Sequence, residues 1–470
     1  MKYIKHFFTF LILFAFVACD DLLELEPKGE IIADEALKTP ADVQALLNSA
    51  YDVLRGTGGD FLGGRFQSIA EVMSDNIDGK PGSLDNADLL AYYNKTSSFF
   101  TGYTQAMFDE PYIVIYRANV LLTSMDLVPG LTDEDKLRIA AEAKFLRALS
   151  YFELVRLFAQ PYGYTADNSH LGVVVRTTPN ADPQDRNTVA QVYERIVIDL
   201  TEAAAELPTT NSVYATQWSA KAYLAKVYFH MHDFDQAFEM ANDVIENSPY
   251  EFNTSADEYA NRYSPGGTNE AVFEQVSSQN DHRGPQFSTH FRTDQATPPT
   301  LRISRNMYDV ATSDPADIRG QQWYTIVNDG ESDERISISK FDGDNYFDVP
   351  MITITELKFI RAESSAEIHT DFTQALADLN DIRNRAGLAD ITDVDDKAEL
   401  LSLIRVEKRK EFVAEGIRFH DLRRIGAKGE SVIIRGSQWN CPGMAIQFPD
   451  GEIAGAGGTE FFTPNEEGGC

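Results

Sequence analysis

The stretch at residues 218–252, WSAKAYLAKVYFHMHDFDQAFEMANDVIENSPYEF, predicts two helices with a break at His232–Asp233. Small residues stand in both halves, among them Ala225 and Ala237. Small side chains let two neighbouring helices approach closely. The stretch therefore predicts a helical hairpin.

The spacing inside this hairpin resembles the tetratricopeptide repeat. Leu224, Ala225, Tyr228, Ala237 and Pro249 fall at positions 7, 8, 11, 20 and 32 of a unit that starts at Trp218. A looser copy spans 354–388, and a third, interrupted copy would pair a helix at 135–159 with the segment 188–208. One hairpin cannot bury its apolar face alone, so stacked hairpins would share a continuous core.

The predicted helix at 135–159 is apolar on most sides, which places its charged residues in or near the core. Lys144, Arg147, Glu153 and Arg156 then need partners, because a buried unpaired charge is costly.

Long segments rich in Gly, Pro, Asn and Asp separate the copies, at 160–187, 250–300 and 311–348. Only short β-like runs accompany them, such as VVVRTT at 173–178 and ISISKF at 336–341. The fold prediction is mainly α: tetratricopeptide-like hairpins packed against a loop-rich face with a few short strands. We expect residues 41–470 to form a single domain, because stacked hairpins share one core.

Composition excludes one class of partner. The chain has 470 residues with 41 Lys and Arg against 73 Asp and Glu, and its formal net charge is −32. Nucleic-acid phosphates require basic surfaces, so no nucleic-acid partner is expected. A hydrophobic content of 43% suffices for a packed core.

The first 18 residues predict a signal peptide. Lys2 and Lys5 precede an apolar run of about a dozen residues, too short to cross a bilayer, which takes roughly 20. FVAC, ending at Cys19, resembles a lipoprotein lipobox with Phe16 in the usual place of Leu. Cys19 is therefore the predicted lipidation site and membrane anchor, and 19–40 an acidic tether. The alternative is an ordinary secreted protein with a free thiol near its start.

The other two cysteines leave two alternatives open. Cys441 and Cys470 either pair and bracket the C-terminal segment, as leftover thiols of an exported protein do, or are kept apart by a frayed C-terminus.

Several segments along the chain resemble one family, the SusD/RagB outer-membrane nutrient-binding lipoproteins. They include IAEVMSDNIDG at 69–79, PYIVIYRANVLL at 111–122 and AEAKFLRALSYFELVRLFAQPYG at 141–163. DVPMITITELKFIRAES at 348–364 matches a further motif, with Thr353 in place of the usual Arg. RVEKRKEFVAEGIRFHDLRRIG at 405–426 carries the family's residues Glu407, Glu411, Glu415, Gly416, Arg418, Asp421, Leu422 and Arg424 in register.

The resemblance implies a function. Family members are anchored by lipid to the outer membrane, face outward, and bind a nutrient, often an oligosaccharide, for a TonB-dependent transporter. A tetratricopeptide-type scaffold of an envelope assembly, with no small ligand, is the alternative from a different class.

No enzyme activity, cofactor or metal is expected. The sequence lacks a zinc-protease H-E-x-x-H and a G-x-S-x-G nucleophile elbow. His230 and His232 stand two apart, so they point in opposite directions on a helix. The acidic run at 342–348 lacks the glycine and terminal glutamate of an EF-hand, so it is interpreted as an acidic turn.

The ligand site is predicted where aromatic rings and polar side chains share loops, because sugars stack on rings and their hydroxyls need hydrogen-bond partners. Tyr92, Tyr93 and Asn94 meet this criterion in one stretch, and Trp323 and Tyr324 meet it in another. Arg283, with Gln286, is a further candidate. The alternative for each ring is that it packs beneath its own loop.

Overall fold

The computed structural model describes residues 37–55, 61–80, 84, 86–180, 182–256, 262–280, 290–296, 298–344, 346–466 and 469–470. The predicted signal peptide, Cys19 and most of the tether lie outside these residues, as do Arg283 and Gln286. Within the described ranges, no helix combines the length and the apolar character that a membrane crossing requires.

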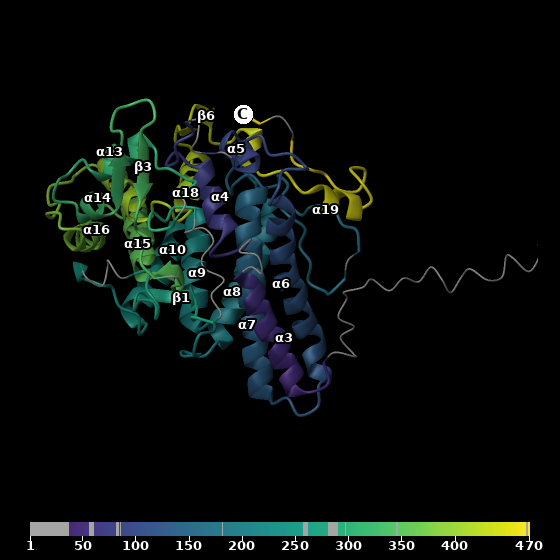
Figure 1. Ribbon diagram of the computed structural model, residues 1–470. Coiled ribbons are helices and arrows are strands. Elements are labelled where there is room, and N and C mark those ends of the chain that lie inside the picture. The colour runs from purple at the N-terminus through teal and green to yellow at the C-terminus, as the bar shows by residue number, and fades with distance from the viewer. Residues whose placement is uncertain are drawn as a thin grey trace, which may run out of the picture.

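Three stacked helical hairpins form the centre of the molecule. They are α7 (Asp133–Phe158) with α8 (Val189–Glu206), α9 (Gln217–His230) with α10 (Phe234–Asn247), and α15 (Ile354–Ile368) with α16 (Thr373–Arg385). Because α8 also packs on α9, and α10 on α15, the hairpins share one continuous stack (Figure 1). Ala225 and Ala237 are fully buried between the helices, as the repeat register predicts. The predicted mainly α fold is confirmed.

Polar caps define where these helices begin. Thr188 and Thr216 each accept a hydrogen bond from a backbone N–H one turn into α8 and α9, and Asp233 does the same for α10. Asp233 thus ends the break between the two helices of the hairpin at 218–252, where His232 has a positive φ of 62°. The chain reverses at the predicted position.

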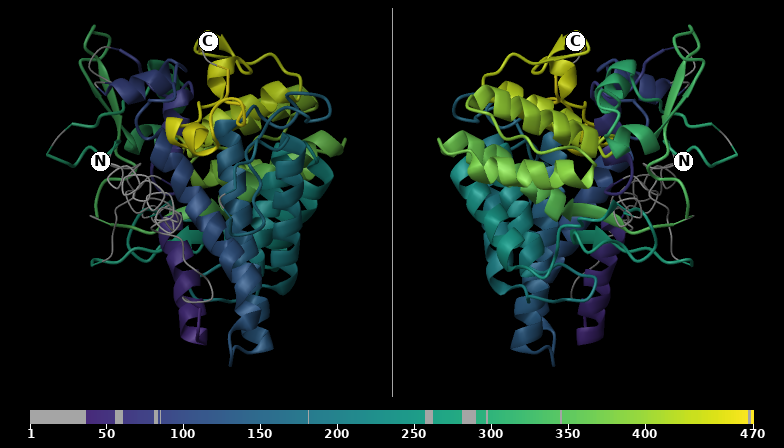
Figure 2. Two further views of the ribbon diagram at one scale, coloured as in Figure 1. Left: turned by 90° about the vertical axis from the view of Figure 1, so that its right-hand side faces the viewer. Right: turned by 90° about the vertical axis from the view of Figure 1, so that its left-hand side faces the viewer.

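The N-terminal helices extend the stack. α3 (Pro40–Leu54) and α6 (Thr104–Ser124) pack on each other and on α7, and the turn η1 (Met125–Leu127) follows α6 (Figure 2). α4 (Arg65–Met73) contacts both α5 (Ala87–Tyr93) and α18 (Ile417–Ala427). α17 (Lys397–Glu411) covers α15 and α16 with a second, smaller apolar cluster.

The described strands form three short antiparallel pairs. β1 (Ala271–Gln275) pairs with β4 (Val349–Thr353), β2 (Tyr324–Val327) with β3 (Arg335–Ile338), and β5 (Ile433–Ile434) with β6 (Ser437–Gln438). The predicted run at 336–341 thus falls partly in β3. The run at 173–178 is assigned to no strand; the backbone just before it bonds instead to Asn187.

Short elements fill the remaining segments. α13 (Arg305–Ala311) and α14 (Ile318–Gln322) precede the β2–β3 hairpin, so about a third of the predicted loop at 311–348 forms α14, β2 and β3. At the C-terminus, η2 (Pro442–Met444) and α19 (Asp450–Gly455) follow β6. Cys441 and Cys470 form a disulfide, which settles the two alternatives in favour of pairing.

The charged residues of α7 have the partners that burial requires. Lys144 pairs with Glu202 at 2.8 Å, Arg147 with Asp199 at 2.8 Å, and Arg156 with Glu153. These contacts confirm that the charges of this helix are paired.

Two charged residues of α18 pair with residues outside this helix. Arg418 bonds Asp75 at the end of α4, at 2.8 Å, whereas Asp421 pairs with Lys408 of α17, also at 2.8 Å. Tertiary contacts therefore supply the partners of both residues.

Candidate functional site

Two of the predicted ligand-binding rings are buried. Tyr92 is 0% exposed, and its hydroxyl donates to the carbonyl oxygen of Gly102 at 2.9 Å. Trp323 is 8% exposed, with the ammonium of Lys340 4.7 Å from its ring centroid. The expectation of exposed rings is wrong for these two residues, because each ring packs beneath its own loop.

Tyr324 also faces inward. Its ring lies edge-on to Tyr308 at 5.8 Å, and its hydroxyl oxygen is buried. Burial raises the pKa of this phenol, an effect that the nearby Arg319 opposes. The ring therefore stabilises the β2–β3 hairpin and presents only part of its surface to solvent.

Tyr93 and Asn94 lie nearer to solvent. Asn94 is exposed at the end of α5, and Tyr93 is half-buried. The guanidinium of Arg435 lies 3.8 Å from the Tyr93 ring centroid and donates to the Tyr93 carbonyl oxygen. A Cβ at Gly79 would lie 2.3 Å from Cζ of the ring, so only glycine permits this approach. The Tyr93 ring thus packs between Gly79 and Arg435.

The two predicted stretches, far apart in sequence, are linked through residues 76–80. Asp78 donates its backbone N–H to Arg302 at 2.9 Å, and Ser304 donates to Asn76 at 2.7 Å. Ile303 then donates to Ile336 of β3 at 2.9 Å. The structure thus brings the α5 stretch and the β2–β3 stretch to one side of the molecule. Of the five described residues predicted to bind ligand, Asn94 is exposed and Tyr93 and Tyr324 are partly exposed.

A further aromatic site, absent from the sequence predictions, lies beside this region. Trp439 is half-buried, whereas the other two tryptophans of the chain, Trp218 and Trp323, are each 8% exposed. A Cβ at Gly426 would lie 2.2 Å from the Trp439 ring, so this ring rests directly on the backbone of α18. Tyr164, 41% exposed, meets the ring edge-on at 6.3 Å.

The β5–β6 hairpin connects the two aromatic sites. Arg435, in its turn, contacts Tyr93, and Lys95 donates to the carbonyl oxygen of Ile434 at 2.9 Å. Figure 1 shows β6 next to α5 at the top of the molecule. We define the upper face as Tyr93, Asn94, Tyr164 and Trp439. Trp439 stands between Gln438 and Asn440, so the predicted pattern of rings beside amides also occurs here.

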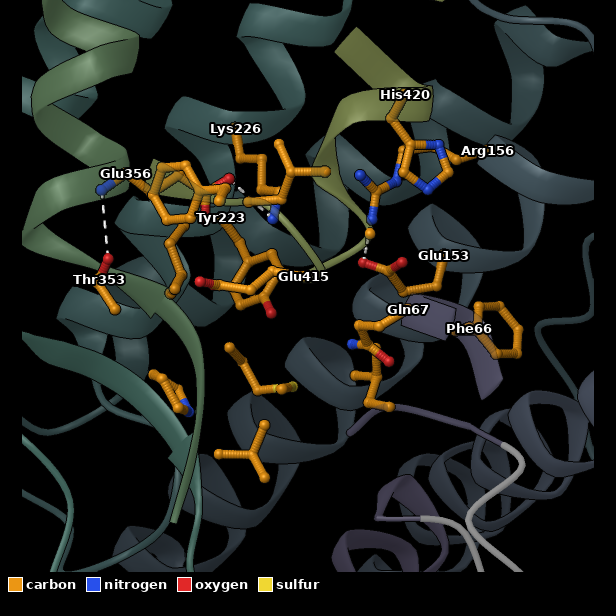
Figure 3. Close-up of a pocket in the computed structure, with 18 of the residues that line it drawn as sticks. Phe66, Gln67, Glu153, Arg156, Tyr223, Lys226, Thr353, Glu356, Glu415 and His420 are labelled. Carbon is orange, nitrogen blue, oxygen red and sulfur yellow. Dashed lines mark hydrogen bonds and ion pairs between the residues drawn. The ribbon is translucent and has the colours of Figure 1, made fainter. Parts of the chain in front are cut away.

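A polar cavity lies at the centre of the molecule (Figure 3). Its volume is about 60 Å³, and its walls carry the ion pairs Glu153–Arg156 and Lys226–Glu356, together with Glu415 and His420. Ligand sites measure roughly 300–1,000 Å³, whereas this volume fits a few water molecules. The cavity is therefore too small for an oligosaccharide.

Comparison with known proteins places the chain in a family. A profile described as SusD family matches residues 183–452, more than half of the chain, and one described as "Starch-binding associating with outer membrane" matches residues 23–229. The chain belongs to the SusD family. The resemblance in the sequence motifs is thereby confirmed.

Individual relatives agree with this assignment. A SusD-like protein of Formosa agariphila is 32% identical over 251 residues, which cover 52% of this chain and 46% of that protein. The matched segment thus spans about half the length of such curated relatives.

Solved structures of the SusD superfamily share the fold. One from Bacteroides thetaiotaomicron has a TM-score of 0.77 at 24% identity and covers 91% of this chain and 100% of its own. A laminarin-binding SusD-like protein has a TM-score of 0.72 at 22% identity and covers 91% and 99%.

Proposed function

We propose that this protein is a surface-exposed lipoprotein of the outer membrane that binds an oligosaccharide and passes it to a TonB-dependent transporter. The match of the SusD family profile over more than half of the chain carries this proposal. The description of the second profile and the laminarin-binding relative both favour a glycan as the ligand. The protein acts by binding, without chemical conversion of the glycan.

We assign the glycan to the upper face. A sugar ring offers flat C–H surfaces and hydroxyl groups, and recognition needs a rigid ring beside a few fixed polar groups. Trp439 on Gly426 supplies the ring, and Asn94 supplies an exposed amide. Tyr92, Trp323 and Tyr324 pack within the protein next to their own segments, and Arg283 remains a predicted ligand contact.

The test is calorimetry on the mature protein with laminari-, cello-, malto-, xylo- and mannohexaose. We expect one or more of these hexasaccharides to bind, and Trp439→Ala to weaken that binding roughly 10-fold, by analogy with the stacking of nucleic-acid bases on aromatic rings. Trp439→Phe, which keeps a ring, should lose less. Phe461→Ala, which removes an exposed ring elsewhere, is the control and should leave affinity unchanged.

Two results would contradict the proposal. If neither the five hexasaccharides nor a wider glycan panel bind, the tetratricopeptide-type scaffold without a small ligand becomes the better description. If the glycan is cleaved during incubation, the protein is an enzyme and binding is only its first step.

A further inference from the structure

A second, larger concavity lies along α6 and α19. Its volume is about 680 Å³, within the range of ligand sites. One wall is α6, the second is formed by Arg176, Asn180 and Pro183, and the third is α19. Figure 1 shows α6 and α19 on the opposite side of the molecule from the β2–β3 hairpin. We call this concavity the lateral groove.

Aromatic rings form the α6 wall. Tyr112 and Tyr116, one helical turn apart, both line the groove and are half-buried. Tyr112 donates its hydroxyl to the carbonyl oxygen of Val174 at 2.8 Å and packs on Phe108, with ring centroids 4.7 Å apart. These contacts fix the ring before any ligand arrives, so little side-chain entropy would be lost on binding.

Carboxylates lie along the same groove. The side-chain carboxylate of Glu452, on α19, has no hydrogen-bond or ion-pair partner among the described residues, although the residue is only partly exposed. Burial raises its pKa, an effect that Arg176 opposes. Asp109 accepts a hydrogen bond from Gln105 at 2.7 Å, and burial raises its pKa as well. A half-buried carboxylate without a donor gains a partner when a hydroxyl group binds.

The charges of the groove balance. Arg117 and Arg176 oppose Asp109 and Glu452, so the lining has two positive and two negative side chains. Arg176 is held by the carbonyl oxygens of Asn180 and Asp182, at 3.2 and 3.0 Å. A strongly charged ligand would gain little there, whereas hydroxyl groups can donate to the carboxylates and accept from the guanidinium groups.

We propose that the lateral groove is a second oligosaccharide site, specific for uncharged, hydroxyl-rich sugars that stack on Tyr116 and Tyr112. This inference rests on the proposed glycan-binding function and adds a separate site to it. Each protein molecule would then hold two oligosaccharides, one on the upper face and one in the groove.

The experiment is calorimetry of the full mature chain with the neutral hexasaccharide that binds most tightly among the five named above. The wild type should bind two molecules. Tyr116→Ala should lose one of them or weaken it about 10-fold, whereas Tyr116→Phe should retain it. Ile113→Arg places a bulky charge in the groove from a residue that is 40% exposed, so the fold should tolerate it.

Leu137→Arg on α7 is the matched control, because Leu137 is also apolar and 55% exposed but does not line the groove. Thermal unfolding verifies that each variant is folded. Hexagalacturonate, which carries a carboxylate on every sugar, should bind the groove more weakly than the neutral probe.

The outcomes separate the two proposals. If the wild type binds one molecule, and this binding is lost in Trp439→Ala but unchanged in Tyr116→Ala and Ile113→Arg, the proposal of a site in the lateral groove is overturned. The proposed function is then intact. Loss in the groove variants alone supports the groove and refutes the upper face. Preferential binding of hexagalacturonate in the groove overturns the assignment to neutral sugars, and absence of all binding overturns both proposals.

Discussion

A substitution of Glu411, at the end of α17, is the strongest test of how this fold is stabilised. Its carboxylate is fully buried and accepts from Arg262 and Arg385 at 2.9 Å each, and from Arg319 at 3.3 Å. Burial alone would raise the pKa of Glu411, but Arg385, Arg262 and Arg319 outweigh burial and lower the pKa to about 2. The ionised form is therefore strongly favoured in the folded state.

This pKa translates into stability. A drop of the pKa from the ordinary value of 4.5 to about 2 contributes about 3 kcal/mol to the free energy of unfolding at neutral pH. Each tenfold change in proton affinity is worth about 1.4 kcal/mol. We expect Glu411→Gln to lower the free energy of unfolding at pH 7 by about that amount. Breaking a buried ion pair on one side commonly costs about 3–5 kcal/mol, which agrees.

The pH dependence has a defined sign. Because the pKa is lower in the folded protein, the contribution is complete above about pH 5 and is lost progressively as pH falls from 4.5 toward 2. At pH 3 the difference between wild type and Glu411→Gln should have shrunk to about 1 kcal/mol. Urea unfolding at pH 7 and pH 3, followed by circular dichroism, measures both values.

Glu399→Gln is the matched control, because Glu399 lies on the same helix but is exposed. A surface change of this kind should stay within about 0.5 kcal/mol. If Glu411→Gln costs no more than Glu399→Gln at pH 7, or if its cost grows as pH falls, the ionised Glu411 does not stabilise the fold.

Two further predictions concern the backbone and the membrane anchor. Gly416 has φ +77°, and a Cβ there would lie 2.6 Å from the carbonyl oxygen of Gln67. Gly330 has the same φ, but a Cβ there would have no neighbour within 4 Å. Gly330→Ala should therefore lower the free energy of unfolding in urea by only about 1 kcal/mol, and Gly416→Ala should lower it by more. Equal losses of unfolding free energy in the two variants would show that the backbone at Gln67 shifts to make room for the methyl group. Mass spectrometry of the native protein should find Cys19 acylated and no peptide from 1–18, and mild detergent extraction should co-purify a large β-barrel transporter. An unmodified Cys19, or recovery of the protein alone after cross-linking, would contradict the proposed anchor and partner respectively.

The helical hairpins were predictable because their signal is local. The register of Leu224, Ala225 and Ala237 depends on helix geometry and on the close approach of two adjacent helices. A segment of about 35 residues determines both. The pairing of β1 with β4 was not predictable in this way. Ala271 and Thr353 pair only because the stack of α9, α10 and α15 brings their segments together. No short sequence pattern predicts a contact between residues so far apart in the chain.

Exposure of the aromatic rings was the least predictable property. Tyr92 and Tyr93 are adjacent and chemically alike, yet one is 0% exposed and the other is half-buried. Which face of α5 turns inward depends on α4 and on the loop to Gly102, and neither is visible in the residues around the pair. Trp439 is the opposite case, a partly exposed ring that the sequence did not single out. Its position depends on Gly426, 13 positions earlier on another element.

The residues that make the family recognisable are those that hold the loops on the helices. Glu71 accepts hydrogen bonds from the backbone N–H groups of Ala414 and Gly416, both at 3.0 Å, which fixes the start of α18 on α4. Glu411 joins Arg319 of the long 311–348 segment to Arg385 at the end of α16. Such buried polar contacts tolerate few substitutions, because removing one partner leaves a charge or a donor uncompensated.

The surfaces that we assign to glycans have the opposite character. Asn94, Tyr164 and Tyr116 are open to solvent at least in part, and a substitution at an exposed position costs the fold little. A chain can therefore retain the buried contacts that define its family while its exposed rings and amides change with the sugar that it binds. For this reason the sequence motifs identify the fold and the family, whereas the sugar must be determined by binding measurements on the upper face and the lateral groove.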